Sequence, residues 1–195
     1  MLNLPLSRSC RKYIFRDLIL VDSGRKISKQ LTEVKKFFDN KPTFANRVHI
    51  VHLSISFEKY ALIFIDPNFT SILQLFVKSP MPPHELCLGE LGSLEDPMLV
   101  IRQLGESFFS QTLTILRVGE CVNFPLHFFL ICPRLREVFL GRVEATDKSY
   151  DKYPVNHCSG REAPLLEVLN YRNSHSLVEQ MIAPPLRFST PVVLW

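Results

Sequence analysis

The stretch Thr112–Val143, TLTILRVGECVNFPLHFFLICPRLREVFLGRV, decides the fold class of this protein. It contains the pattern apolar-x-x-apolar-x-apolar twice, first at Leu113, Leu116 and Val118 and again at Leu135, Val138 and Leu140. Alternating apolar residues over so short a run are typical of a half-buried β-strand, because successive side chains of a strand point to opposite faces. The stretch therefore predicts two similar short strands joined by an intervening segment.

The same pattern recurs on both sides of this stretch. Its other copies are Phe15/Leu18/Leu20, Ile50/Leu53/Ile55, Pro83/Leu86/Leu88 and Leu166/Leu169/Tyr171. The central positions 18, 53, 86, 116, 138 and 169 are separated by 35, 33, 30, 22 and 31 residues. A unit that returns with such a period indicates a repeat architecture, in which no single unit can bury its apolar face until a neighbour stacks on it.

Helical periodicity fills the segments between the predicted strands. We expect helices over Ser28–Phe38, Asn68–Lys78, Asn123–Cys132 and Ser174–Ala183, and a further helix that begins at Asp96-Pro97. Ser28 and Asn123 are candidate N-caps, and the sequon Asn68-Phe69-Thr70 is interpreted as a helix cap. Asp96 can cap a helix whose first residue is Pro97, because proline has no N–H to leave unsatisfied there.

The alternation of strands and helices predicts an α/β fold, and two architectures give that alternation. A leucine-rich-repeat-like solenoid of short parallel strands, irregular and incompletely capped, fits better than a doubly wound sheet. The strands are short, and the close glycine pair Gly89 and Gly92 lacks the spacing of a dinucleotide-binding loop. The doubly wound alternative predicts a glycine-bearing pocket at the strand ends.

Composition and charge favour a globular domain and argue against a nucleic-acid-binding protein. The sequence has 195 residues, 46% of them hydrophobic and 22% charged, as expected for one globular domain. Residues 1–50 carry a net charge of +7 and the remainder −3. The basic residues are spread out along the sequence, which favours a solvated helix face over a nucleic-acid site.

Two absences and the cysteine pattern predict the compartment. No apolar run reaches the ~18–20 residues of a membrane span, and the N-terminus lacks the order of a secretory signal. The five cysteines are odd in number and scattered, which suits a reducing environment. We therefore expect an intracellular protein, cytoplasmic or nuclear, that does not bind a membrane.

The stretch Thr112–Val143 resembles the repeat unit of fungal F-box/leucine-rich-repeat proteins. The resemblance is carried by Phe124-Pro125-Leu126 and by the segment Cys132–Leu140, whose pattern returns at Ala163–Leu169. The segment Leu6–Leu18 is similar to the junction that follows the F-box in that family. The pattern covers residues 112–171 closely and residues 48–92 loosely.

The resemblance implies a domain division and a function. Residues 1–20 would be the remnant of the F-box C-terminal junction leading into the first strand, and residues 21–195 the leucine-rich-repeat-like domain. The domain would act without catalysis, as the substrate-recognition region of a ubiquitin-ligase receptor that holds a protein target. Since Met1–Leu6 is too short to be an F-box, we expect little binding to the Skp adaptor. The alternatives are a stand-alone repeat scaffold or fragment with no ligase coupling, and a small doubly wound enzyme.

Candidate partner-binding residues follow from the strand pattern. The outward positions of the predicted strands are Ser54, Cys87, Arg117, Phe139 and Asn170. The polar stretch Ala145–Ala163 is long for a connecting loop, and long loops are often functional. We therefore expect a protein partner to contact the outward positions, above all Arg117, Phe139 and Asn170, together with Tyr150 and Tyr153 of the loop.

The sequence predicts no catalytic, cofactor or metal site. The pairs that could suggest one are His84 with Cys87, His157 with Cys158, and Cys121 with His127. The first two lack a second ligand pair at a zinc-finger spacing, and nothing in the third brings the two side chains together. Cys132 is interpreted as a small buried hydrophobe. Phosphate-binding loops and nucleophile-elbow motifs are also missing from the sequence.

Overall fold

The computed structural model describes residues 16–21, 27–54, 62–94, 96–145 and 164–183. These residues form an α/β fold built on one parallel β-sheet, so the predicted class is confirmed. The strands are β1 (Asp17–Val21), β2 (Ile50–Ser54), β3 (Glu85–Gly89), β4 (Gly92–Ser93), β5 (Ile115–Phe124), β6 (Glu137–Ala145) and β7 (Val168–Arg172). The helices are α2 (Ile27–Asn40), α4 (Pro67–Val77), α5 (Pro97–Val100), α6 (His127–Leu130) and α8 (His175–Ile182), with a 3-10 helix η1 (Pro42–Arg47) and a π-helix η2 (Ile101–Phe109).

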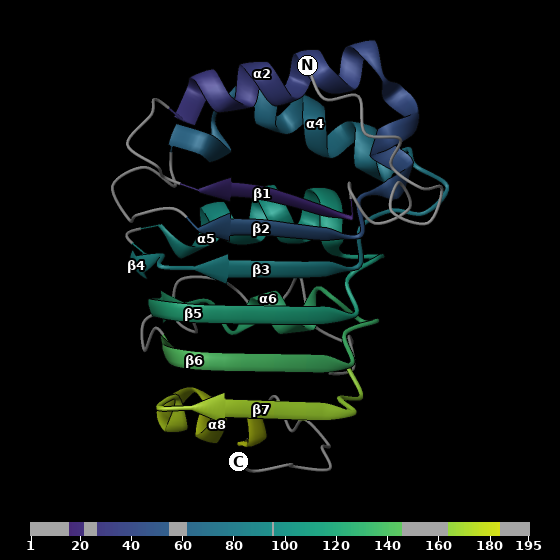
Figure 1. Cartoon of the computed structure of the whole chain (residues 1–195). Helices are drawn as coiled ribbons and strands as arrows, with labels where there is room; N and C mark the ends of the chain where they lie inside the picture. The colour runs from purple at the N-terminus through teal and green to yellow at the C-terminus, as the bar shows by residue number, and fades with distance from the viewer. Residues whose placement is uncertain (1–15, 22–26, 55–61, 95, 146–163, 184–195) are drawn as a thin grey trace, which may run out of the picture.

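Strand order in the sheet follows the order of the sequence. The path is β1-β2-β3-β5-β6-β7, every pairing is parallel, and the two-residue β4 pairs with the far part of β5. A doubly wound sheet would reverse its strand order at one point, and the described strands contain no such reversal. In Figure 1, α5 and α6 lie behind the sheet and α2 and α4 lie at its β1 end, so the helices of the described residues leave the near face of the strands open.

Two rows of apolar side chains, each taking one residue from every strand of this path, form the core against the helices. The first row is Leu18, Val51, Leu86, Leu116, Val138 and Leu169, of which Leu18 is 9% exposed and the other five are fully buried. The second row, two residues further along, is Leu20, Leu53, Leu88, Val118, Leu140 and Tyr171. In five of the six units, these are the central and last apolar positions that the sequence pattern predicted.

The second unit corrects the sequence analysis. We predicted Leu53 as its central position, but Val51 pairs with Leu18 and Leu86, and Leu53 belongs to the second row. The pattern there begins at Val48, which is 2% exposed, rather than at Ile50. The error arises because Ile50 and Val51 are both apolar and both buried, so alternation alone did not fix which of them faces the helices.

The N-termini of α2 and α4 also differ from prediction. Ser28 is the second residue of α2 and not its cap. Helix α4 begins at Pro67, and its cap is Asp66, whose carboxylate accepts a 2.8 Å hydrogen bond from the Asn68 N–H. At α8, Ser174 stands at the N-cap position, but its hydroxyl accepts from the Val143 N–H at 2.8 Å and makes no hydrogen bond to the helix.

The helix predicted over Asn123–Cys132 is wrong in its first half. Strand β5 continues to Phe124, and the helix is only the four residues of α6. Asn123 has a left-handed backbone (φ 64°), and its amide donates to the Leu94 carbonyl at 3.4 Å. The Leu94 N–H in turn donates to the Val122 carbonyl, so a tertiary contact with the segment around β4 extends the strand. That contact could not be read from local sequence.

The helix that begins at Asp96 is confirmed and contains a π-helical portion. The Asp96 carboxylate accepts from the Met98 N–H at 3.1 Å, as the Asp-Pro signal predicted. From Ile101 the helix widens, and the Ser110 N–H donates to the Gly105 carbonyl five residues earlier. Gly105 faces α6 so closely that a β-carbon there would overlap Ile131 Cδ1. Close approach of two helices therefore explains this glycine.

Candidate functional site

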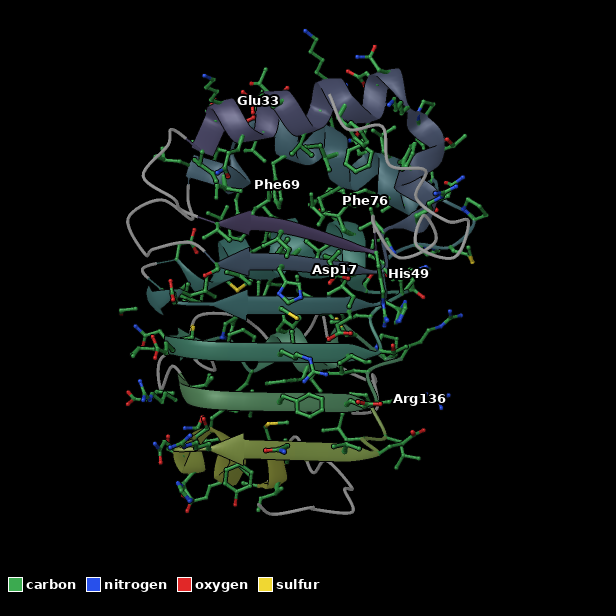
Figure 2. The ribbon with its side chains drawn as sticks, in the orientation of Figure 1. Asp17, Glu33, His49, Phe69, Phe76 and Arg136 are labelled. Atoms are coloured by element: carbon green, nitrogen blue, oxygen red, sulfur yellow. The ribbon has the colours of Figure 1, made fainter. Side chains whose placement is uncertain are left out.

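The uncovered face of the sheet carries a row of side chains that lies between the two core rows. This open-face row is Ile19, His52, Cys87, Arg117, Phe139 and Asn170, one residue from each strand. Figure 2 shows side chains projecting from this face of the strands toward the viewer. A groove of about 400 Å³ crosses the strands here, lined by His52, Leu53, Ser54, Cys87, Leu88, Gly89, Arg117, Val118, Gly119, Phe139, Leu140, Gly141 and Asn170.

Arg117 is held in place by contacts to the strands on either side of it. Its Nε donates to the Glu85 carboxylate at 2.7 Å, and that carboxylate belongs to a residue only 7% exposed. On the other side, the guanidinium carbon lies 3.9 Å from the centroid of the Phe139 ring. A charge-assisted bond and a cation–π contact together restrict a side chain that would otherwise have many rotamers.

Three adjacent glycines form a second row, which we call the glycine row: Gly89, Gly119 and Gly141. None of the three has a positive φ, and a β-carbon at each would meet at most an ordinary van der Waals contact. The equivalent positions on β2 and β7 are Ser54 and Arg172, so the backbone there accepts side chains. The fold therefore does not require glycine in this row, and its effect is to open the groove.

The residues that follow Gly89, Gly119, Gly141 and Arg172 have a left-handed backbone. These residues are Glu90 (φ 58°), Glu120 (φ 51°), Arg142 (φ 59°) and Asn173 (φ 54°). Each is exposed and is followed by a buried residue, so the left-handed turn lets two successive side chains avoid the core before alternation resumes. Arg142 pairs with Glu120 at 2.7 Å across β5 and β6. A left-handed backbone at a non-glycine residue costs about 1–3 kcal/mol. Its recurrence at four equivalent positions is therefore a regular feature of the repeat.

Sequence reasoning missed the glycine row although a signal was present. The sequences Leu88-Gly89-Glu90, Val118-Gly119-Glu120 and Leu140-Gly141-Arg142 repeat the same apolar-Gly-charged triplet directly after the strand pattern. Extending the repeat template by two positions would have found it.

Two histidines lie next to each other where β2 and β3 begin. The rings of His49 and His84 are 5.7 Å apart, and Figure 2 places His49 and Arg136 along the edge where the strands start. Burial lowers the pKa of His49 below 6.5, and the neighbouring His84 and Arg16 lower it further, against an opposing effect of Asp17. His49 is therefore favoured in its neutral form at this edge.

The three cysteines of the described residues are thiols of low reactivity. Burial raises the pKa of Cys121 and of Cys132 to about 12. The pKa of Cys87 is also raised to about 12, first by burial and then by the nearby Glu85. Cys132 is fully buried, which confirms its prediction as a small hydrophobe. A nucleophilic cysteine needs a lowered pKa, so none of the three is activated.

The predicted contact residues fall into three groups. Arg117, Phe139 and Asn170 lie on three consecutive strands, in one row as predicted. Ser54 also lines the groove, but it pairs with Gly89. The position beside Cys87, which we had predicted for Ser54, is occupied by His52. This follows from the shifted register of β2. Tyr150 and Tyr153 lie outside the described residues.

Among the described residues, no group of three or more His, Cys, Asp or Glu side chains could hold a metal ion. None of the described helices is long and apolar enough to cross a membrane. The glycine-bearing pocket expected of a doubly wound enzyme has a partial counterpart in the groove, but Gly119 and Gly141 lie within strands and not at their ends.

Comparisons of the sequence and the structure with protein-family models, with curated proteins and with solved structures give no match.

Proposed function

We propose that this protein is a leucine-rich-repeat-like solenoid that binds another protein through the open face of its sheet. One observation carries the proposal: Arg117, Phe139 and Asn170 line a groove whose floor is the glycine row. Aromatic residues and arginine are enriched at protein–protein interfaces relative to the rest of the protein surface. The glycine row leaves room beside them although the fold accepts larger residues there.

The order of the strands supports the solenoid part of the proposal. Each unit contributes one strand to a parallel sheet in sequence order, and each strand begins in the same way. For example, the His84 carbonyl accepts from both the Thr114 and Ile115 N–H groups, and the Arg136 carbonyl accepts from both Glu167 and Val168. Equivalent hydrogen bonds in successive units are expected of a stack of repeats.

The resemblance to F-box/leucine-rich-repeat proteins suggests the form of the activity. In this proposal the protein holds a target without changing it chemically, and any modification is made by a ligase bound elsewhere. The alternative is a repeat scaffold with no ligase coupling. Mixing the protein with purified Skp adaptor on a gel-filtration column separates these two. We expect little or no complex, which is the result that favours the scaffold, and a stoichiometric complex would contradict that expectation and favour ligase coupling.

Protein binding is tested by comparing which proteins are captured by the wild type and by two double variants. Phe139→Ala/Asn170→Ala truncates the open face on β6 and β7. Arg136→Ala/Glu167→Ala is the control, because it removes an exposed 2.8 Å ion pair immediately before the same two strands. We expect at least one protein captured by the wild type and the control to be lost by the open-face variant. Retention of every captured protein by that variant would refute the proposal.

A further inference from the structure

Taking the proposed function as its basis, we propose that the groove binds a short extended segment of the partner that presents a carboxylate to Arg117. The segment would lie across the strands on the glycine row. The inference names the chemistry of the ligand and so goes beyond protein binding in general.

The polar groups that line the groove favour an anion. Arg117 is the one formally charged side chain among the lining residues, if histidine is counted as neutral. Asn170 adds an amide that can donate hydrogen bonds, whereas the Ser54 hydroxyl already donates to the Glu90 carboxylate at 3.4 Å. The partner of Arg117, Glu85, is buried one row nearer the strand starts and does not line the groove. A ligand in the groove therefore meets donors and a positive charge.

Arg117 is prepared for a carboxylate by the way it is held. Its bond to Glu85 uses Nε, and within the described part of the protein its two Nη atoms have no hydrogen-bond partner. The two Nη groups can bind a carboxylate with two parallel hydrogen bonds. Because Glu85 and Phe139 already fix the guanidinium, little side-chain entropy remains to be lost on binding.

The charge balance favours a carboxylate over a phosphate. Arg117 carries one positive charge, and the Glu85 carboxylate bonded to it already makes the pair formally neutral. A phosphate group of roughly two negative charges would leave charge uncompensated in the groove. A single carboxylate adds about half as much negative charge and can still accept the hydrogen bonds of the Nη groups; it can come from an aspartate or glutamate side chain or from the free C-terminus of a polypeptide.

The glycine row sets the length of the segment. Gly89 and Gly141 are two strand spacings apart, which is roughly 10 Å, and an extended peptide advances about 3.3 Å per residue. About three residues can therefore lie on the row. Ser54 on β2 and Arg172 on β7 bound it, since each puts a side chain where the middle strands have none. A peptide backbone can approach the sheet closely only between them.

The test uses a phage-displayed library of random 12-residue peptides, selected on the whole protein. Enriched peptides are then synthesised, and their affinities are measured for the wild type, Arg117→Met, Gly119→Ile and the control Arg136→Met. We expect the enriched peptides to share a carboxylate, and their affinity to fall roughly tenfold or more in the first two variants. The control should bind within about twofold of the wild type, because Arg136 does not line the groove.

Two peptide changes identify the source of the carboxylate. Replacing the shared Asp or Glu by Asn or Gln tests a side chain, and amidating the peptide tests the C-terminus. The inference requires one of these changes to weaken binding as much as Arg117→Met does. It is overturned if the library yields no binder, or if the binders need no carboxylate or bind Arg117→Met as well as the wild type.

These results separate the inference from the proposed function. Peptides that depend on Phe139 and Asn170 but not on a carboxylate leave the proposed function standing and refute only the charge assignment. If the Phe139→Ala/Asn170→Ala variant retains every protein that the wild type captures, the proposed function itself is refuted. Urea unfolding of Arg117→Met and Gly119→Ile verifies that each variant is folded when its affinity is measured.

Discussion

The guanidinium of Arg117 lies over the ring of Phe139, with 3.9 Å between the guanidinium carbon and the ring centroid. The two residues are register partners on β5 and β6, 22 positions apart in the sequence. Because the same guanidinium is bonded to Glu85 on β3, three neighbouring strands are tied together on the open face by side chains as well as by backbone pairing.

The contact between Arg117 and Phe139 should be measurable as a coupling energy. In a double-mutant cycle with Arg117→Met and Phe139→Leu, we expect a coupling of about 0.5–1 kcal/mol in the free energy of unfolding, the usual range for a partly exposed cation–π pair. Urea denaturation of the four proteins provides the measurement. Strict additivity of the two single changes would mean that the stacking contributes nothing to stability.

Removing Arg117 should leave Glu85 buried without its partner. We expect Arg117→Met to lower the free energy of unfolding by about 1–2 kcal/mol, less than a fully buried pair would lose because the Arg117 side chain is 44% exposed. The double variant Arg117→Met/Glu85→Gln should recover part of that loss, since the unpaired charge is then absent. Failure of the second change to restore any stability would contradict this account of the pair.

Two glycines should respond in opposite ways to larger side chains. Gly119→Ile should leave stability unchanged or raise it by up to about 1 kcal/mol, because a β-carbon fits and isoleucine suits a strand. Gly105→Ala should lower it by up to about 1 kcal/mol, since the added carbon overlaps the Ile131 Cδ1 methyl in a closely packed contact and the cost of moving that side chain outweighs the helix propensity of alanine. Thermal unfolding of both variants tests the contrast. A clear loss of stability in Gly119→Ile would show that the fold does require glycine in this row.

Stability should decrease as the pH falls below the ordinary pKa of histidine. The pKa of His49 in the folded protein is below 6.5, the value that we take for the unfolded state. As the pH falls through 6.5, the unfolded state takes up a proton that the folded state resists, so the free energy of unfolding decreases. We expect His49→Gln to reduce the difference in stability between pH 7 and pH 5. The exposed His175→Gln is the control, and an equal effect of both variants would contradict the prediction.

The described cysteines should be protected from alkylation. At pH 8, iodoacetamide should modify Cys121 and Cys132 far more slowly in the folded protein than in urea, because burial raises the pKa of both thiols to about 12. Peptide mass spectrometry gives the extent of reaction at each cysteine separately. Rapid modification of Cys121 in the native protein would indicate that β5 is not packed against the helices in solution.

Much of the fold could be predicted because its units are local. The spacing of Leu113, Leu116 and Val118 predicted a strand with two buried positions, and the structure buries all three. The Asp96-Pro97 signal predicted a helix start because a cap depends on residues adjacent in the sequence. Three of the five candidate contact residues were placed together for the same reason: Arg117, Phe139 and Asn170 hold equivalent positions in successive units.

By itself, the sequence determined which residues could form strands, the direction in which their side chains alternate, and the α/β class, since all three depend on residue spacing along a few positions. Only the tertiary structure decided that Val51 rather than Leu53 pairs with Leu86, because two adjacent apolar residues satisfy either register until a neighbouring strand selects one. It likewise decided the pairing of Arg117 with Glu85 and the alignment of the three glycines. Those relationships join residues about 20–30 positions apart, and they exist only after the strands have stacked.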